Sequence, residues 1–277
     1  MKDREDLREV QQQLEEHIAQ YRSVVVGFSA GVDSSVVAVA ANAALGDNAL
    51  IVTATTETII SEDIELARSI AQTYSLNYRE IAYNELEVEG YAQNPTNRCF
   101  FCKDALHNNL TKIAEERGGA VILDGTNADD EGDYRPGRDA ARNHGVRSPL
   151  LELGLDKVTV RGLAKLYSLS NHDKPSAPCL SSRVPYGTAI TREILDKIGN
   201  AEGRLRDLGF RELRVRHHDD VARLELPQNE FAQAILLADA IDKAVRESGY
   251  RYVALDLRGF RSGSLNEVLT QIELPRG

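Results

Sequence analysis

The sequence has no apolar run close to the roughly 20 residues that a membrane-spanning helix needs. Its N-terminus, Met1-Lys-Asp-Arg-Glu-Asp6, is charged and is not followed by the apolar segment of a secretory signal peptide. The sequence also has no excess of positive charge: its formal net charge is −10 at pH 7. Sequence-independent binding to nucleic acid requires a basic surface. We therefore expect a soluble, cytoplasmic protein whose partners include neither a membrane nor a nucleic acid.

Cysteine is scarce, since the chain contains three: Cys99, Cys102 and Cys179. An odd number of thiols in a reducing compartment does not suit a disulfide framework and indicates metal binding or catalysis. Cys99 and Cys102 form a C-x-x-C at the expected start of a helix, a spacing that lets two sulfurs face one ion. Three thiolates would leave one position of a tetrahedral site open for chemistry. A structural zinc half-site and two unrelated small hydrophobic side chains are the alternatives for this pair.

The segment Ser29-Ala-Gly-Val-Asp-Ser-Ser35, the serine loop, lies between an apolar strand-like run and a helix-like run. A strand that turns through small residues into a helix presents free N–H groups and a positive dipole end to phosphate. The spacing and the lysine of a Walker loop are absent, so the usual means of γ-phosphoryl transfer are missing. The serine loop resembles the PP-loop, S-G-G-x-D-S, of the ATP pyrophosphatases, which cleave ATP between its α- and β-phosphates and adenylate a substrate.

Most of the serine loop matches this pattern, in the residues Ser29, Gly31, Asp33, Ser34 and Ser35. Ala30 occupies the position of the first glycine of the pattern. Because alanine does not readily adopt a positive φ, we expect either an ordinary φ at Ala30 or an altered loop. All six residues are candidates for binding ATP, and a serine-rich helix cap is the alternative explanation of the segment.

The first part of the chain alternates strand-like runs with helical patterns. Strand-like runs cover 24–28, 49–54, 78–82 and 120–123; helical patterns cover 3–21, 34–45, 62–75 and 102–117. This alternation predicts an α/β domain with a parallel sheet covered by helices on both faces. Ligands of such sheets bind beyond the carboxyl ends of the strands, where the loops after Phe28 and Leu123 should lie.

The segment 124–147 is acidic, contains glycine and shows no clear periodicity, so we expect a long functional loop. It opens with the acidic loop, Asp124-Gly-Thr-Asn-Ala-Asp-Asp130, which resembles the second nucleotide-site motif of PP-loop enzymes. This resemblance implies that Gly125 and Asn127 contact ATP. We expect Asp129 or Asp130 to bind Mg²⁺ together with Asp33, because hard oxygen ligands suit that ion. A solvated turn is the alternative.

The segment 171–183 is rich in proline and serine, and this composition indicates a domain boundary. We place the boundary between residues 180 and 181. Beyond it we expect a smaller α+β domain. Its predicted elements are a helix at 192–208, strands at 211–218 and 221–226, a helix at 229–247 and a strand at 250–257. The first domain, 1–180, would bind the nucleotide, and the second, 181–277, would complete its site.

Three arginines are candidates for binding the phosphate of a substrate. Period-two alternation places Arg214 and Arg216 on one face of the predicted strand, and Arg183 lies near Cys179 in the sequence. Guanidinium groups bind phosphate through two parallel hydrogen bonds. A solvated sheet face is the alternative for Arg214 and Arg216. We find no convincing Ser/His/Asp arrangement, and a thiolate or sulfide nucleophile needs no general base.

Motifs along nearly the whole chain resemble the LarE family: the serine loop, Asp133-Tyr-Arg-Pro-Gly137, Ser181-Ser-Arg-Val-Pro-Tyr-Gly187, Arg214-Val-Arg216 and Asp256-Leu-Arg-Gly-Phe-Arg-Ser-Gly263. The resemblance implies an ATP-dependent sulfur transferase that adenylates carboxylates of pyridinium-3,5-biscarboxylic acid mononucleotide and converts them to thiocarboxylates. It places the enzyme in synthesis of the nickel-pincer cofactor of lactate racemase. It also implies a homo-oligomer, with a hexamer as one candidate state.

The best-known LarE proteins use one cysteine, at the position of Cys179, and sacrifice its sulfur. This chain departs from them in having Cys99 and Cys102 as well. In this respect it is similar to three-cysteine LarE proteins and to the cluster-dependent tRNA thiolases of the PP-loop superfamily. The resemblance therefore implies a 4Fe-4S cluster held by three thiolates, whose free iron carries a labile sulfide. The alternatives are sacrifice of Cys179, a tRNA thiolase, an amidating ligase, and a zinc-stabilised nucleotide-binding module without turnover.

Overall fold

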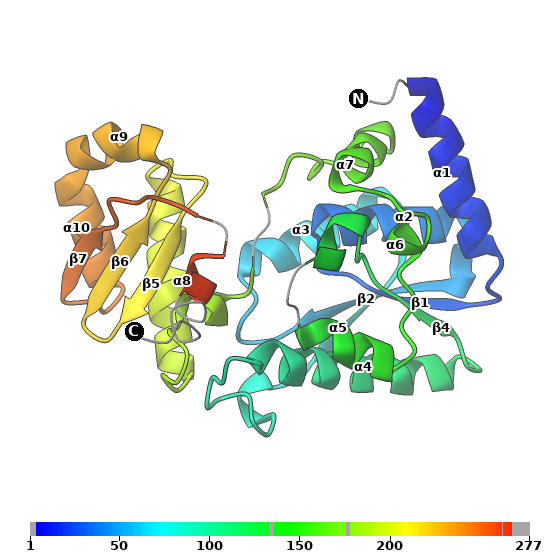
Figure 1. Ribbon diagram of the computed structural model, residues 1–277, viewed down its shortest axis with the longest axis horizontal. Helices are drawn as coiled ribbons and strands as arrows, with labels where there is room; N and C mark the ends of the chain where they lie inside the picture. Colours follow the sequence, from blue (N-terminus) through cyan, green and yellow to red (C-terminus); the bar gives the residue numbers. More distant parts are fainter. Residues whose placement is uncertain (1–3, 133–135, 176–177, 262, 268–277) are drawn as a thin grey trace, which may run out of the picture. The chain divides into compact units, whose positions relative to one another are not determined.

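The computed structural model describes residues 4–132, 136–175, 178–261 and 263–267. The chain divides into two compact units, both drawn in Figure 1. The first unit contains residues 1–91 and 97–177, and the second contains 92–96 and 178–277. None of the described helices is long and apolar enough to cross a membrane.

The first unit is built on a four-stranded parallel sheet with the strand order β3-β2-β1-β4 (Figure 1). The strands are β1 (Val24–Gly27), β2 (Ala49–Thr55), β3 (Asn77–Ala82) and β4 (Val121–Leu123). Strand β1 is central and pairs in parallel with both β2 and β4. The predicted parallel α/β sheet is thereby confirmed. Since β1 and β4 are neighbours, the loops that leave their carboxyl ends begin side by side.

Helices cover both faces of this sheet, as the alternation of strand side chains requires. Val24 and Val26 of β1 belong to a core with Leu14 of α1 (Arg4–Ala19) and Val36 of α2 (Val32–Leu45). Helices α3 (Ser61–Thr73) and α7 (Lys157–Leu166) also contribute to that core. Val25 of β1 points the other way and packs in a second cluster with residues of α4 (Arg98–Glu116). Strand β1 is therefore buried on both sides.

The prediction of a long loop over 124–147 is wrong in its second half. This segment contains a 3₁₀ turn (Ala128–Gly132) and the helix α5 (Pro136–Asn143), and a short helix α6 (Pro149–Glu152) follows. Helix α5 packs against α4 and buries Ala140 completely. A two-turn helix has little stability of its own, so tertiary packing that no local pattern reveals must stabilise it.

The second unit contains a three-stranded sheet with the order β5-β6-β7 (Figure 1). Strand β5 (Arg214–His218) is antiparallel to β6 (Val221–Glu225), which is parallel to β7 (Tyr252–Leu255). Helices α8 (Arg192–Asp207) and α10 (Ala238–Glu247) contact this sheet. The single helix predicted at 229–247 is broken at Leu237, where α9 (Phe231–Leu236) ends before α10 begins.

The division between the units differs from the predicted boundary at 180/181 in two ways. Pro178, Cys179 and Leu180 belong to the second unit, and so does the short segment 92–96. The Asn94 side-chain amide donates hydrogen bonds to the carbonyl oxygens of Pro185 (2.8 Å) and Thr188 (3.0 Å). These contacts join residues about 90 positions apart, so the spacing of local signals could not reveal them.

A buried ion pair stabilises the second unit. Both Glu202 on α8 (0% exposed) and Arg183 (3% exposed) are removed from solvent. Two parallel hydrogen bonds of 2.8 and 2.9 Å join the guanidinium to the carboxylate. The Val215 backbone N–H also donates to Glu202, at 3.0 Å. Burial alone would raise the pKa of Glu202, but Arg183 and the Val215 amide outweigh burial and lower it.

We predict that Glu202→Gln destabilises the second unit by about 3 kcal/mol or more, because Arg183 is left buried without its counter-charge. Hydrogen–deuterium exchange of α8 and β5 peptides during urea titration would measure this change. The lowered pKa means that the contribution of Glu202 is present above the pKa of an unfolded glutamate and is lost as pH falls through the folded value. The stability of Glu202→Gln should therefore lack the part of the pH dependence that the Glu202 carboxylate causes.

Glu193→Gln is the matched control, because Glu193 lies on the same helix but is 77% exposed beside Lys197. Exposed ion pairs of this kind contribute little. Equal exchange in the two variants would contradict a stabilising role for the Arg183–Glu202 pair.

Candidate active site

The serine loop joins the carboxyl end of β1 to the first turn of α2. Its hydroxyl groups hold it folded: Ser35 Oγ donates to the Gly31 carbonyl at 2.8 Å, and Ser34 Oγ donates to the same oxygen at 3.1 Å. The Ser29 backbone N–H donates to Ser34 Oγ at 3.3 Å. No side chain of the described residues caps the α2 N-terminus at Gly31. The serine hydroxyls therefore shape the loop, and the N–H groups of the first helical turn remain as donors for an anion.

Gly31 has room for a side chain within the chain itself. A Cβ placed there would meet Ser29 Oγ at 3.4 Å and Ser34 Oγ at 4.0 Å, which are ordinary contacts. Its φ of −75° is also accessible to any residue. The described residues therefore give no steric reason for a glycine at position 31. A phosphate that approaches the backbone closely would give one.

Ala30, in contrast, adopts the conformation expected of glycine. Its φ is +54° and its side chain is completely buried. The expectation of an ordinary φ is therefore wrong, and alanine occupies the left-handed region at the position of the first glycine of the pattern. This conformation costs about 1 kcal/mol relative to glycine and requires support from surrounding groups.

The acidic loop lies directly against the serine loop. A Cβ added to Gly125 would lie 2.7 Å from the Ser34 backbone nitrogen and 3.0 Å from the Asp33 carbonyl carbon. Neither atom can move without displacing the first turn of α2. Gly125 is thus required for the two predicted nucleotide motifs to meet, as expected for strands β1 and β4 that are neighbours in the sheet.

The other predicted residues of the acidic loop organise its backbone. Asn127 is buried, and its Oδ1 accepts a hydrogen bond of 3.0 Å from the Asp129 N–H. Asp130 Oδ2 accepts one of 3.1 Å from the Asn127 N–H. Among the described residues, no group of three or more His, Cys, Asp or Glu side chains is arranged to hold a metal ion. That Asp33 and Asp130 bind Mg²⁺ together stays a prediction.

Lys157, which sequence analysis missed, connects the two loops. Its ammonium group contacts Asp33 Oδ2, and its backbone N–H donates to Asp129 Oδ2 at 2.9 Å. The other oxygen of the Asp33 carboxylate, Oδ1, is buried and has no hydrogen-bond partner among the described residues. An unsatisfied carboxylate oxygen at this place fits a Mg²⁺ ligand that completes its coordination when the metal arrives with phosphate.

A local signal in the sequence could have revealed Lys157. Asp156 caps the N-terminus of α7 by accepting a hydrogen bond of 2.8 Å from the Thr159 N–H. Val160, Leu163 and Ala164 follow at helical spacing and are all buried. An N-cap aspartate before such a pattern predicts a helix whose first residue is Lys157.

Cys99 and Cys102 lie near the start of α4, which begins at Arg98 and not at the predicted residue 102. Cys99 is exposed and Cys102 is half-buried, and neither forms a disulfide. The Cys102 thiol donates to Glu85 Oε1 at 3.2 Å. Glu85 is only 3% exposed and accepts a second hydrogen bond, of 2.7 Å, from Thr58. Both thiols of the C-x-x-C are thus available from one helical turn of the first unit, as a pair of metal ligands requires.

Cys179 belongs to the second unit, where arginines hold its backbone. Arg183 Nη1 donates to the carbonyl oxygens of Pro178 (2.6 Å) and Cys179 (3.1 Å). Arg216 Nη1 donates to the Ser182 carbonyl at 2.6 Å, and its Nη2 donates to Glu225 at 2.9 Å. These contacts favour a positioning role for both arginines. Their predicted role in binding phosphate stays a prediction.

Arg214 is the arginine whose surroundings most favour an anion. Its guanidinium lies 4.9 Å from the centre of the Phe260 ring. Burial, with the nearby charges of Arg183 and Arg216, lowers the pKa of Arg214 to about 10. The group is still cationic at neutral pH, and its Nη1 donates a hydrogen bond of 2.7 Å to the Leu213 carbonyl oxygen.

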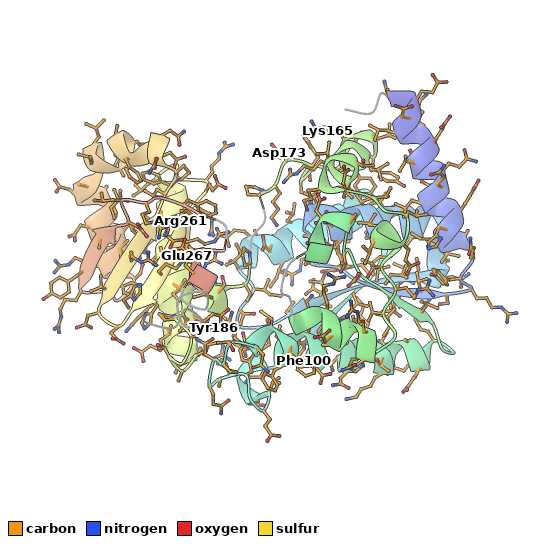
Figure 2. The ribbon with its side chains drawn as sticks, in the orientation of Figure 1. Phe100, Lys165, Asp173, Tyr186, Arg261 and Glu267 are labelled. Carbon is orange, nitrogen blue, oxygen red and sulfur yellow. The ribbon has the colours of Figure 1, made fainter. Side chains whose placement is uncertain are left out.

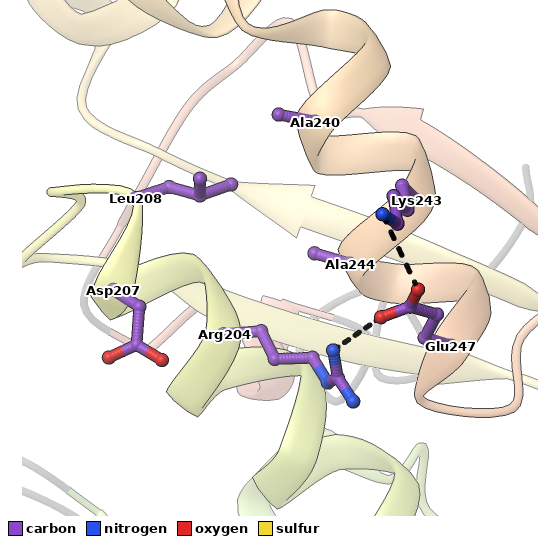
Figure 3. A pocket seen from close by; sticks show the side chains of 7 residues that line it. All are labelled: Arg204, Asp207, Leu208, Ala240, Lys243, Ala244 and Glu247. Atoms are coloured by element: carbon purple, nitrogen blue, oxygen red, sulfur yellow. Dashed lines mark hydrogen bonds and ion pairs between the residues drawn. The ribbon is translucent and has the colours of Figure 1, made fainter.

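Two further polar features of the second unit contain none of the predicted site residues. Arg261 Nε donates to Glu267 Oε1 at 2.9 Å, and both residues are labelled in Figure 2. A groove between α8 and α10, shown in Figure 3, is lined by charged residues that pair with one another, including Arg204 with Glu247 at 2.5 Å. Of the motif at 133–137, the residues Asp133, Tyr134 and Arg135 lie outside the described residues.

The chain is similar to several known proteins. The NAD synthase family model matches residues 5–112. An uncharacterized protein of Synechocystis sp. is 43% identical over 250 residues, which cover 89% of this chain and 93% of that protein. The pyridinium-3,5-bisthiocarboxylic acid mononucleotide synthase of Lactiplantibacillus plantarum is 38% identical over 252 residues, 91% of each chain. An uncharacterized protein of Methanocaldococcus jannaschii is 27% identical over 241 residues, 87% of this chain and 92% of that protein.

We predict that Gly125→Ala displaces the first turn of α2, because the added methyl group would overlap the Ser34 nitrogen. Strain of this kind costs about 1–3 kcal/mol. Urea unfolding followed by circular dichroism would measure it. Gly203→Ala is the control, since Gly203 lies within α8 and a Cβ there would meet no atom within 4 Å. That change should leave stability unchanged or raise it. Equal stability of the two variants would contradict the contact between the two loops.

Proposed function

The chain belongs to the LarE family of PP-loop proteins, and from this membership we propose that it is an ATP-dependent sulfur transferase acting on pyridinium-3,5-biscarboxylic acid mononucleotide. The relative from Lactiplantibacillus plantarum is named for the bisthiocarboxylic acid form of this mononucleotide. The structural observation that carries the proposal is the buried, unsatisfied Oδ1 of Asp33, within the described residues, at the start of α2. A carboxylate beside free N–H donors suits a magnesium-bound polyphosphate.

Membership of the PP-loop family implies the use of ATP and Mg²⁺. We assign Asp33 to the Mg²⁺ ion and the N–H groups of the first turn of α2 to the phosphates. The ammonium group of Lys157 would leave its ion pair with Asp33 and pair with the pyrophosphate instead. The negative charge of the pyrophosphate grows as it leaves. Preorganised donors of this kind stabilise the charge that develops in the transition state.

The chemistry proceeds in two displacement steps. A carboxylate oxygen of the substrate attacks the α-phosphorus, the bond between the α-phosphorus and the bridging oxygen breaks, and pyrophosphate leaves with that electron pair. A sulfur nucleophile then attacks the carbonyl carbon of the acyl-adenylate, and AMP leaves with the carboxylate oxygen. Neither step changes the oxidation state of the substrate carbon, and an anionic sulfur requires no general base.

For the sulfur donor we propose the three cysteines acting as ligands of a 4Fe-4S cluster. Cys99 and Cys102 fit this role because they lie three residues apart at the start of one helix and form no disulfide. Cys179 fits it because it forms no disulfide and Arg183 holds its backbone in place. When bound, the cluster would supply a sulfide that can be replaced after each reaction. Sacrifice of the Cys179 sulfur is the competing proposal, and it leaves Cys99 and Cys102 without a role in the reaction.

For the substrate phosphate we propose Arg214 as the principal ligand, because its guanidinium is cationic at neutral pH and lies against the Phe260 ring, with the charges of Arg183 and Arg216 nearby. Arg183 and Arg216 would act mainly through the backbone around Cys179. This assignment divides the predicted phosphate-binding arginines into one that meets the ligand and two that position the nucleophile.

We predict that Asp33→Asn lowers substrate-dependent pyrophosphate release by about 100-fold, because the Mg²⁺ ion loses its charged ligand. The measurement is pyrophosphate release with ATP, Mg²⁺ and the pyridinium mononucleotide. Asp139→Asn is the control, since Asp139 is 67% exposed and pairs with Arg142 on α5. Undiminished release by the Asp33 variant would disprove the metal assignment. Failure of the intact protein to form a thiocarboxylate with any sulfur source would disprove the function.

We predict that anaerobically reconstituted protein contains iron and acid-labile sulfide, and that Cys99→Ser, Cys102→Ser and Cys179→Ser each lower the iron content. The mass of Cys179 should be unchanged after turnover, because the transferred sulfur comes from the bound sulfide. Iron, zinc and sulfide analysis with mass spectrometry would check both points. Absence of iron together with loss of one sulfur from Cys179 would instead establish sacrifice of the cysteine.

A further inference from the structure

The unusual conformation of Ala30 requires an explanation outside the serine loop. The other non-glycine residues with positive φ among those described are all polar: Ser75, Asn94, Ser168 and Asp219. Short polar side chains can stabilise a left-handed conformation through local hydrogen bonds, whereas a methyl group cannot. Ala30 is also fully buried, so solvent cannot stabilise its backbone. Support must therefore come from residues that contact the Ala30 peptide group.

Two side chains from the segment after α7 supply this support. Asn171 Nδ2 donates a hydrogen bond of 2.9 Å to the Ala30 carbonyl oxygen, and Lys174 Nζ donates one of 3.3 Å to the same oxygen. We propose that Asn171 and Lys174 form a clamp that holds Ala30 in the left-handed conformation, and that they are positioning residues for the nucleotide loop. The clamp would replace the conformational freedom of the glycine that the PP-loop pattern has at this position.

The clamp acts on the part of the loop that determines its shape. The Ala30 carbonyl belongs to the peptide group that precedes Gly31, so fixing its direction fixes how the chain enters the first turn of α2. Asn171 Nδ2 also donates to Ser35 Oγ at 2.8 Å, and Ser35 Oγ in turn donates to the Gly31 carbonyl. One buried amide therefore holds both ends of the turn. Asn171 Oδ1 has no hydrogen-bond partner among the described residues. The hydrogen bonds that Nδ2 donates therefore fix the orientation of the amide.

Neighbouring elements keep the clamp itself rigid. Arg161 on α7 donates hydrogen bonds of 3.0 Å to the carbonyl oxygens of both His172 and Lys174. The Lys174 ammonium also pairs with Asp63, in the first turn of α3, at 2.7 Å. Asn171 is 4% exposed, and Lys174 and Asp63 are each 19% exposed. The donors therefore approach Ala30 from a backbone that is fixed at two helices, as a positioning role requires.

The binding measurement in the following test rests on the proposed function, because it assumes that the protein binds MgATP. The unfolding measurement does not depend on that function. The test is a double-mutant cycle with the intact protein, Ala30→Gly, Asn171→Ala and the double variant. Glycine adopts positive φ without help, so it should make the clamp dispensable. Calorimetric titration with MgATP would give the dissociation constant, and urea unfolding would give the midpoint of each protein.

We expect Asn171→Ala alone to weaken MgATP binding by about tenfold, and by less than about threefold when Ala30→Gly is also present. Lys174→Met should show the same dependence with a smaller change. Asn108→Ala, which removes an exposed amide on α4, should change neither quantity in either background. A change for Asn171→Ala that is the same in both backgrounds would overturn the clamp, because the amide would then serve something other than Ala30.

The unfolding data separate failure of this proposal from failure of the proposed function. If no variant binds MgATP, the assignment of ATP as substrate fails, and the clamp is judged by unfolding alone. Ala30→Gly should then raise the urea midpoint more in the Asn171→Ala background than in the intact protein. Additive midpoints would overturn the clamp whether or not the nucleotide binds.

Discussion

The contact between Gly125 and the first turn of α2 is the constraint on which the first unit depends. It is possible because β1 and β4 are neighbours in a parallel sheet, so the loops that follow them leave the same edge. The absence of a side chain at Gly125 lets the acidic loop lie against the backbone of Asp33 and Ser34. Lys157 then joins both loops through Asp33 and Asp129. The proposed nucleotide site thus depends on a close approach between the backbones of the two loops.

In the second unit, the constraint is to hold the backbone of Cys179, the proposed sulfur ligand, on an irregular segment. Only one turn of 3₁₀ helix, Leu180–Arg183, follows Cys179, so regular structure provides little rigidity. Arg183 donates to the backbone carbonyls just before that turn, and Arg216 donates to the Ser182 carbonyl within it, while Glu202 and Glu225 hold their guanidinium groups. Buried charge is costly in itself, but paired in this way it fixes one geometry. Under our proposal, this role explains why the arginines near Cys179 need not all contact the substrate.

The sequence predicted the features of this protein that depend on local pattern. Buried runs such as Val24–Gly27 and the helices between them predicted the parallel sheet, and small residues at Ser29–Ser35 predicted the turn into α2. Features that depend on distant partners were missed or mispredicted. Helix α5 requires packing on α4, and the conformation of Ala30 requires Asn171, which is 141 residues away. Asp33 could be recognised from its motif, whereas local pattern could place Lys157 at a helix start but could not reveal its contact with Asp33, which is 124 residues away.

The contact between Lys157 and Asp33 also explains how an acidic protein can accept a polyanion. The chain carries a formal net charge of −10, and Asp33, Asp129 and Asp130 surround the proposed nucleotide site. The ammonium group of Lys157 forms an ion pair with Asp33. Under our assignment, MgATP brings a cation for Asp33 and phosphates for Lys157, so both charges keep an opposite partner throughout binding. Exchange of partners in this manner avoids leaving a buried charge uncompensated, and it makes a preformed metal site unnecessary.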